Sequence, residues 1–460
     1  MKKSKLGTMA LVMILFFISA TNESFRKTGS ETKQSNERQS AMQVSSNVSA
    51  LPHTKQYTAD VATQWFALLT EITRNKPYFS PQSLRIFSYS GMALYESVVP
   101  GMPSYQSMYK YFTGNTIEFD DKKNYYWPAC ANAAIARIAS RIMENYPAPN
   151  LVAVQALEAS LNAAYQSEIT PEQLQFSNEF GRNVADKIYD WSKTDGTLIP
   201  GGTLAVCAPY VPFGGPGNWV PTPPAFLPAA GACQGTIRTF IPNIVITVLA
   251  SPHPVYATDP ASVFYQAANE TFQSRNDITA EQTRQFNNWR DLAPNFNPLA
   301  HMLRISTGII IKENLNLEEA ATLYAKQTIA AADAVGAVFK SKFHYSLLRP
   351  ITYIRNVMGH STWNSLPNTP QTPSYPDELS ATASSIAIME NYFGTNYSFV
   401  DSIHKSTFGE WSYSSLNEML GDIVQARVSG GTIFRFGGDA GVIQGRLVGN
   451  MIDQLPFKKE

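Results

Sequence analysis

The stretch that decides the fold is Lys342–Pro350, which reads KFHYSLLRP and ends a long alanine-rich segment. On an α-helix, the spacing from Lys342 to Arg349 corresponds to roughly 700° of rotation and about 10 Å of rise, so both side chains leave the same face. Two long cationic side chains placed in this way can converge on one small oxyanion. Pro350 is expected to end the helix, because the residue before a proline avoids the helical region. The alternative is an ordinary solvated basic pair, which the helix dipole favours at a C-terminus.

Apolar residues recur at helical spacing along most of the chain, and no stretch shows strict period-2 alternation. We find no internal repeat of about 20–50 residues. The sequence therefore predicts an all-α fold with long ordered loops, such as 201–243. The expected helices begin near 58 or 60 and then cover 81–99, 127–146, 151–165, 171–191, 279–292, 317–345, 378–392, 413–428 and 441–455.

The N-terminus has the pattern of an export signal. Residues 1–20 carry three early lysines and then an apolar run that ends in small residues, which predicts a signal peptide, with an uncleaved anchor as the alternative. Residues 21–55 are polar and are expected to form a disordered leader. Residues 56–460 are expected to form a single domain without a membrane span, since no later apolar run reaches about 18 residues. The protein is therefore expected to be exported, either periplasmic or secreted.

The charge is balanced, with 36 basic and 36 acidic residues. No long-range field of one sign attracts nucleic acid or an anionic membrane, so neither is expected as a partner.

Three cysteines occur, and their spacing does not match a zinc site. Cys207 and Cys233 both fall in the long loop, where an exported chain can join them by a disulfide and leave Cys130 free in a helix. Three reduced, partly buried thiols are the alternative.

Three motifs in order carry a resemblance. They are K-x6-R-P at 342–350, a proline-rich approach to a helix start at Ser380, and Arg427 followed by a Gly-Gly pair. This order resembles the vanadium-dependent haloperoxidase and type 2 phosphatidic acid phosphatase (PAP2) superfamily, in its exported bacterial branch. Flanking segments at 279–282, 298–301, 351–355 and 435–441 agree, and the resemblance covers roughly 59–455. It implies two packed helical bundles, with the site between the helices that carry the motifs, over 342–445.

In that superfamily the lysine, both arginines, the serine and a glycine N–H bind phosphate or vanadate. The matching residues are Lys342, Arg349, Arg427 and Ser380, with Ala381 where the glycine normally stands. The donor set is chemically sensible, because arginines give charge-assisted hydrogen bonds to oxyanions and stabilise charge in a transition state. The resemblance thus implies a small phosphate-like anion as partner.

Two departures concern the chemistry. The second motif normally reads P-S-G-H, and the aligned residues 379–382 read LSAT, so Thr382 replaces the acid–base histidine. In the third motif Ile433 stands at the histidine that acts as nucleophile or vanadium ligand, and Gly437 replaces the acidic residue that orients it. Isoleucine neither attacks phosphorus nor coordinates a metal, and a threonine hydroxyl is a poor acid or base near pH 7.

Two interpretations follow. The first is a catalytically silent exported protein that keeps a cationic oxyanion pocket, with no metal site and with vanadate implied by resemblance alone. The second is an active phosphatase or haloperoxidase with a remodelled site. An imidazole within reach of the cations separates them: His344 is expected on another helix face, and His301, His360 and His404 reach the site only through folding. A third pattern, Gly438, Gly441 and Gly445 as a phosphate loop after a TIFRF strand, is weak by itself.

Overall fold

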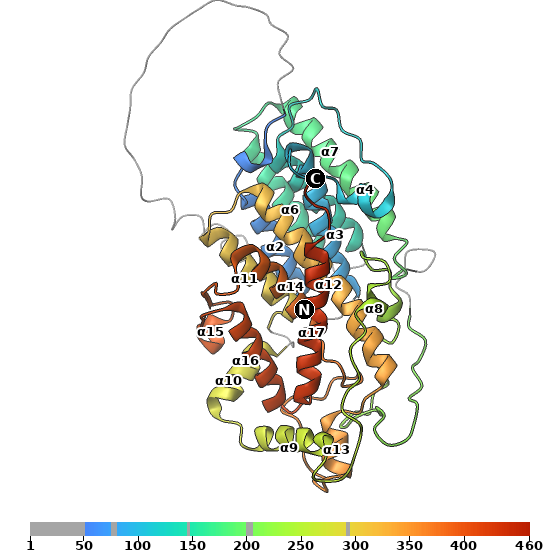
Figure 1. Cartoon of the computed structure of the whole chain (residues 1–460). Coiled ribbons are helices and arrows are strands. Elements are labelled where there is room, and N and C mark those ends of the chain that lie inside the picture. Colours follow the sequence, from blue (N-terminus) through green and yellow to red (C-terminus); the bar gives the residue numbers. More distant parts are fainter. Residues whose placement is uncertain (1–50, 75–80, 145–147, 199–205, 291–294) are drawn as a thin grey trace, which may run out of the picture.

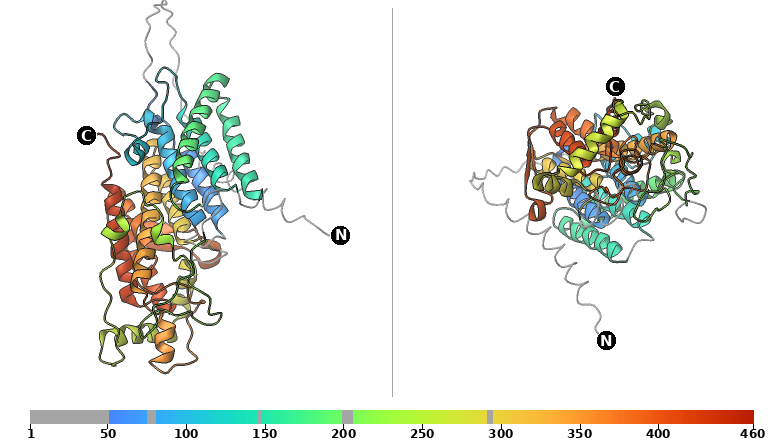
Figure 2. Two further views of the ribbon diagram at one scale, coloured as in Figure 1. Left: turned by 90° about the vertical axis from the view of Figure 1, so that its right-hand side faces the viewer. Right: turned by 90° about the horizontal axis from the view of Figure 1, so that it is seen from below.

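The computed structural model describes residues 51–74, 81–144, 148–198, 206–290 and 295–460. Within this part of the chain the fold is mostly helical, as predicted, with one two-stranded antiparallel sheet. Helices from the first half of the sequence gather at one end of an elongated molecule, and those from the last third gather at the other end (Figures 1 and 2).

The elements follow one another in a fixed order along the described chain. They are η1 (Thr54–Gln56), α2 (Asp60–Thr73), α3 (Pro81–Val98), η2 (Val99–Gly101), α4 (Met108–Thr113), α5 (Trp127–Ile142), α6 (Ala148–Tyr165), α7 (Pro171–Ser192), η3 (Gln234–Thr236), α8 (Ile244–Thr247), α9 (Val263–Asn276), α10 (Ala280–Trp289), α11 (Pro298–Lys312), α12 (Leu317–Tyr345), α13 (Pro350–Asn356), α14 (Leu379–Phe393), β1 (Phe399–Asp401), α15 (Lys405–Phe408), β2 (Trp411–Tyr413), α16 (Leu416–Ser429) and α17 (Arg435–Asp453).

The long helix α12 connects the two bundles, because it packs against α3 on the N-terminal side and against α14 and α17 on the C-terminal side. Its start is fixed by a capping box, in which the side chains of Asn316 and Glu319 each accept from the other residue's backbone N–H. Small residues such as Ala330, Ala334 and Ala337 are fully buried along it, which lets several neighbours approach closely.

The bounds of α12 agree with the predicted helix 317–345, but the expectation that Lys342 and Arg349 lie on one helical face is wrong. The helix ends at Tyr345, and Ser346 takes a left-handed conformation with φ of 48°. Arg349 is the N-cap residue of α13, so Lys342 and Arg349 do not share one helical face. Pro350 opens a helix, since its missing N–H and fixed φ suit the first helical position.

The last two helices also differ from their predicted bounds. Residues 411–413 pair as a strand, so α16 starts at Leu416. Helix α17 starts at Arg435, six residues earlier than predicted. The prediction of a TIFRF strand is therefore wrong. Gly438, Gly441 and Gly445 are helical residues that do not form a phosphate loop.

Glycines on α17 bring it against α14. A Cβ atom on Gly445 would overlap the carbonyl oxygen of Ser380, and one on Gly441 would overlap that of Asp377. The absence of side chains at these positions sets the distance between the two helices, and with it the position of the segment that precedes α14.

The predicted signal peptide lies outside the described residues, as does the leader up to residue 50. Residues 51–55, which composition assigned to the leader, already belong to the fold. Thr54 is fully buried, and its hydroxyl donates a hydrogen bond of 2.7 Å to the carbonyl of Val98.

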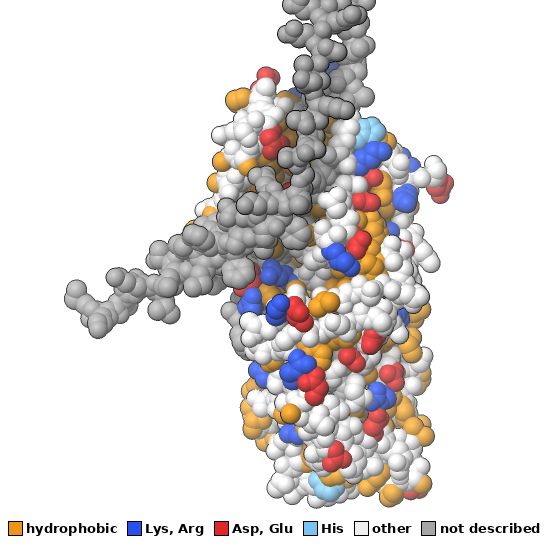
Figure 3. Space-filling model, turned by 90° about the vertical axis from the view of Figure 1, so that its left-hand side faces the viewer, with side chains coloured by type: hydrophobic (Ala, Val, Ile, Leu, Met, Phe, Trp, Pro, Cys, Tyr) orange, Lys and Arg blue, Asp and Glu red, His pale blue; other side chains and the backbone are white. Residues whose placement is uncertain are grey.

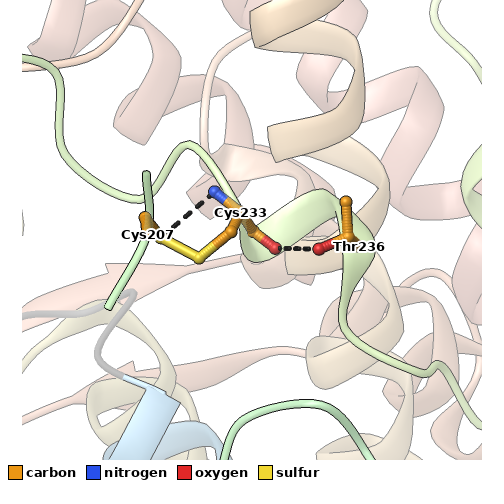
Figure 4. The surroundings of a disulfide bond; sticks show 3 residues. All are labelled: Cys207, Cys233 and Thr236. Carbon is orange, nitrogen blue, oxygen red and sulfur yellow. Dashed lines mark hydrogen bonds between the residues drawn. A yellow bond between two sulfur atoms is a disulfide. The ribbon is translucent and has the colours of Figure 1, made fainter. Parts of the chain in front are cut away.

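The disulfide predicted between Cys207 and Cys233 is present, and Cys130 is a free, buried thiol (Figure 4). The loop that it closes lies over the end of α12. The N–H of Trp219 donates to the carbonyl of Ser346 at 2.6 Å, and that of Leu348 donates to the carbonyl of Gly217 at 2.9 Å. The cross-link thus secures the loop that covers the stretch after Lys342.

No helix in the described ranges has the length and apolar character that a membrane span requires. On the face shown in Figure 3, basic and acidic side chains are interspersed without a large region of one sign. This surface agrees with the balanced composition.

Candidate oxyanion site

Lys342 and Arg349 converge in the folded chain although the helix breaks between them. Both side chains are fully buried. Nζ of Lys342 donates to the carbonyl of Pro373 at 2.7 Å and lies 3.3 Å from Oε1 of Glu378. The guanidinium of Arg349 donates to the carbonyl of Thr372 at 2.7 Å, to its hydroxyl at 2.6 Å and to the carbonyl of Thr432 at 3.1 Å. The two cations are therefore held by the loop that leads into α14.

Two carboxylates stand among the cations. Oε1 of Glu378 lies 3.8 Å from Nη2 of Arg349 and accepts from the Thr372 hydroxyl at 3.0 Å. Asp377 pairs with Arg427 through two contacts of 3.0 Å, and its Oδ1 also accepts from the backbone N–H of Leu379 at 3.1 Å. Asp377 thus meets the third motif and also caps the start of α14.

Arg427 approaches from the last turn of α16. Its Nη2 lies 3.5 Å from Oε2 of Glu378, opposite the oxygen that faces Lys342. The structure therefore brings all three predicted cations, from α12, α13 and α16, to one cluster, as the resemblance implied. We define this charge cluster as Lys342, Arg349, Asp377, Glu378 and Arg427.

The electrostatics follow from this arrangement. Burial alone would raise the pKa of Glu378, but the positive charges of Lys342, Arg349 and Arg427 outweigh burial and hold the pKa below its usual range. Burial lowers the pKa of Lys342 to about 8, against the opposing influence of Glu378. Glu378 is therefore an anion near neutral pH.

Ser380, Ala381 and Thr382 lie in the buried first turn of α14. The N–H groups of Ser380 and Ala381 donate to the carbonyls of Asp377 and Glu378 at 3.4 and 3.3 Å. Within the described ranges, the hydroxyls of Ser380 and Thr382 have no hydrogen-bond partner. The predicted serine and its neighbour are thus close to the charge cluster in sequence without a hydrogen bond to its cations.

The third motif meets the second through its backbone. Gly437 accepts a hydrogen bond of 2.9 Å from the N–H of Asp377. Ile433 is fully buried, and its carbonyl accepts from the hydroxyl of Thr271 at 3.1 Å. Ile433 therefore directly follows the residue whose carbonyl Arg349 contacts, and the end of its side chain lies close to Gly438.

The comparisons with known proteins agree with this geometry. The family model of the VCPO second helical-bundle domain matches residues 322–455, which include the charge cluster. Among solved structures, the first bacterial vanadium-dependent iodoperoxidase is similar with a TM-score of 0.77 and 25% identity over 88% of this chain and 98% of that chain. This chain belongs to the vanadium haloperoxidase and PAP2 superfamily.

A second solved structure of the superfamily, a holo-type bacterial vanadium-dependent chloroperoxidase, shares the fold with a TM-score of 0.63. Its identity is 13%, over 82% of this chain and 92% of that chain. Among curated proteins, none is significantly similar in sequence.

Vanadate is the group that the superfamily implies, and the residues present do not fit it. The cations are suited to an oxyanion, but a carboxylate of the chain lies 3.3 Å from Lys342 and 3.5 Å from Arg427. A second negative group placed there would be repelled at short range in a buried setting. By the resemblance of the third motif, Ile433 stands where the vanadium ligand is expected, and its side chain has no donor atom. Over the described residues, no group of three or more His, Cys, Asp or Glu is arranged to hold a metal ion.

The histidines are engaged elsewhere. Nε2 of His301 lies 3.1 Å from Oδ2 of Asp401, and the His404 ring packs edge-on against the His301 ring at 4.9 Å. His360 stacks on Phe272 at 4.1 Å. None of the partners of Lys342 and Arg349 in the described chain is a histidine.

The ring of His253 contacts a residue that shortly precedes the second motif. Its imidazole lies 5.2 Å from the ring of Tyr375, which precedes Pro376 and Asp377. His253 lies in a loop 122 positions before Tyr375, so their contact arises only in the folded chain.

Asp377 and Glu378 were not among the site residues predicted from the sequence. The available signal was a pair of carboxylates directly after Pro376 and directly before a predicted helix start. Acidic residues at that place are common as helix caps, so the pattern alone does not show that they face three distant cations.

Proposed function

We propose that this protein is an exported member of the superfamily that performs neither the vanadium-dependent haloperoxidase reaction nor the phosphatase reaction. The observation that carries the proposal is that, among the residues that the structure describes, no imidazole is a partner of Lys342 or Arg349. Nucleophilic attack on phosphorus and coordination of vanadium both need such a group in this superfamily. Ile433 and Thr382 supply neither.

The charge cluster then has a structural role. It joins the end of α12, the start of α13, the loop before α14 and the end of α16 through ion pairs and hydrogen bonds. The disulfide supports the exported location, because such bonds persist in oxidising compartments.

The test is a turnover assay of the purified protein after incubation with vanadate. Hydrogen peroxide with iodide, bromide or chloride probes the haloperoxidase reaction, and p-nitrophenyl phosphate probes the phosphatase reaction. We expect no rate above that of the Arg349→Ala variant. Turnover by the unmodified protein that is lost in Arg349→Ala would overturn the proposal.

An enzyme with a remodelled site is the second candidate, and the contact between His253 and Tyr375 favours it. This candidate requires that His253→Ala abolishes turnover while the protein remains folded. His360→Ala is the matched control, because its imidazole also stacks on an aromatic ring, that of Phe272. Equal rates in the two variants and the unmodified protein would exclude His253 as a replacement base.

A further inference from the structure

We infer that the carboxylate of Glu378 is a built-in substitute for the tetrahedral oxyanion of the superfamily and fills the cradle formed by Lys342, Arg349 and Arg427. The inference rests on the proposed function, since a cradle filled by the chain itself has no room for a reacting phosphate or vanadate. The ligand class of the emptied cradle would be a small oxyanion.

The geometry of Glu378 matches that of a bound anion. Its Oε1 lies 3.3 Å from Nζ of Lys342 and 3.8 Å from Nη2 of Arg349. Its Oε2 lies 3.5 Å from Nη2 of Arg427. One carboxylate is thus shared by three cations that come from three different helices or helix ends. Such sharing is what guanidinium and ammonium groups provide to phosphate-like ligands.

The Thr372 hydroxyl fixes the orientation of this carboxylate. It accepts from Nη2 of Arg349 at 2.6 Å and donates to Oε1 of Glu378 at 3.0 Å. The hydroxyl therefore connects a cation to the anion that the cation faces, as a hydroxyl does in an oxyanion site. Thr372 and Arg349 are both fully buried, so these contacts form away from solvent.

Charge balance explains why an external anion is excluded. Three cations face two carboxylates, those of Asp377 and Glu378, which leaves one positive charge in excess. A phosphate or vanadate dianion would reverse the sign of a buried cluster and meet Glu378 at contact distance. Removal of Glu378 restores the charge and the space that such an anion needs.

The position of Glu378 relative to the P-S-G-H motif shows which residue of the motif it would replace. If the P-S-G-H motif is placed on Pro376–Leu379, three residues earlier than in the sequence analysis, the proline of the motif is kept. Glu378 then stands at the glycine, and Leu379 at the histidine. The contacts support this register, because Asp377 and Glu378 face the cations. A glycine there leaves space for an anion, and a glutamate fills that space with its own.

The experiment compares anion binding by the unmodified protein, Glu378→Gly, Glu378→Gln and the double variant D377S/E378G. Glu390→Gln is the matched control, since Glu390 is a buried carboxylate on the same helix that pairs with Arg446. Binding of phosphate and of vanadate is measured by calorimetry, and the melting temperature is measured in phosphate, acetate and chloride at equal ionic strength.

We expect only weak binding to the unmodified protein and to Glu390→Gln. We expect phosphate to bind Glu378→Gly and D377S/E378G at least tenfold more tightly than it binds these two proteins, and to raise their melting temperature. If none of the three Glu378 variants is stabilised by phosphate, vanadate or acetate more than Glu390→Gln is, the inference is wrong. A glycine variant that stays unfolded in every anion counts toward that result. Catalytic turnover by the unmodified protein would overturn the proposed function instead.

Discussion

Glu378 and Lys342 form a buried ion pair, with 3.3 Å between Oε1 and Nζ, although 36 positions separate them in the sequence. The pair belongs to the charge cluster that the proposed inference treats as a filled oxyanion cradle. Removing either charge alone is expected to destabilise the folded protein, because the partner would remain buried without full compensation.

Glu378→Gln is therefore expected to lower the free energy of unfolding by about 3–5 kcal/mol. The amide keeps the shape of the side chain but removes the charge that Lys342 and Arg349 face. Urea denaturation followed by circular dichroism measures the change. Glu281→Gln, which breaks an exposed pair with Arg284, is expected to leave the free energy of unfolding nearly unchanged, because solvent screens such pairs. Similar losses in the two variants would contradict a central role for the charge cluster.

Gly445→Ala is expected to destabilise the protein by about 1–3 kcal/mol or more, since the added methyl group overlaps the carbonyl of Ser380. The matched control is Gly421→Ala in α16, where nothing lies within 4 Å of the new Cβ. That control is expected to stabilise by roughly 0.5–1 kcal/mol, because alanine favours a helix interior. Thermal denaturation of both variants checks the contrast, and an equal response would mean that α14 and α17 are not held at the distance described.

Asp333 predicts a dependence of stability on pH. It accepts from the N–H groups of Phe240 and Ile241 at 2.7 and 2.9 Å, and burial raises its pKa to about 7. From about pH 4 to pH 7 the unfolded chain has lost this proton while the folded chain keeps it, so the contribution of Asp333 to stability falls as pH rises. Asp333→Asn is expected to shrink the difference in unfolding free energy between pH 5 and pH 8.

The control for this prediction is Asp190→Asn, which changes an exposed carboxylate paired with Lys193. Its pH dependence is expected to match that of the unmodified protein. Glu96, whose pKa burial also raises to about 7, contributes in the same direction, so part of the dependence is expected to remain in Asp333→Asn. A curve for Asp333→Asn that coincides with the unmodified one would rule out the assignment.

The disulfide is expected to stabilise the protein by about 3–4 kcal/mol, because it closes a loop with a sequence separation of 26 and restricts the unfolded chain. The double variant C207S/C233S should lose this amount in urea denaturation, and reduction of the unmodified protein should give the same loss. Cys130 is buried, and burial raises its pKa, so it should react with a thiol reagent only after unfolding. Two additional thiols should appear after reduction, and their appearance before it would contradict the cross-link.

Much of the fold could be predicted because the evidence is local. Helix α7 begins at Pro171, as predicted, since a threonine cap and a proline mark its start. It ends within one residue of its predicted end. Helix α17 was predicted to start six residues too late, because its first turns are rich in glycine and resemble a loop. Glycine has a low intrinsic helix propensity, but the close packing of α17 on α14 requires it at these helical positions.

The sequence by itself determined the helical class, the order of the three motifs, the superfamily and the three cations that meet. The helical class follows from local periodicity, whereas the superfamily and its three cations follow from the resemblance that the three motifs carry in their order. Only the tertiary structure decided that Asp377 and Glu378 face those cations, and that Lys342 and Arg349 reach them from two different helices. The physical reason is that the contacts join segments 29 to 50 positions apart, and their approach depends on how closely α17 packs on α14.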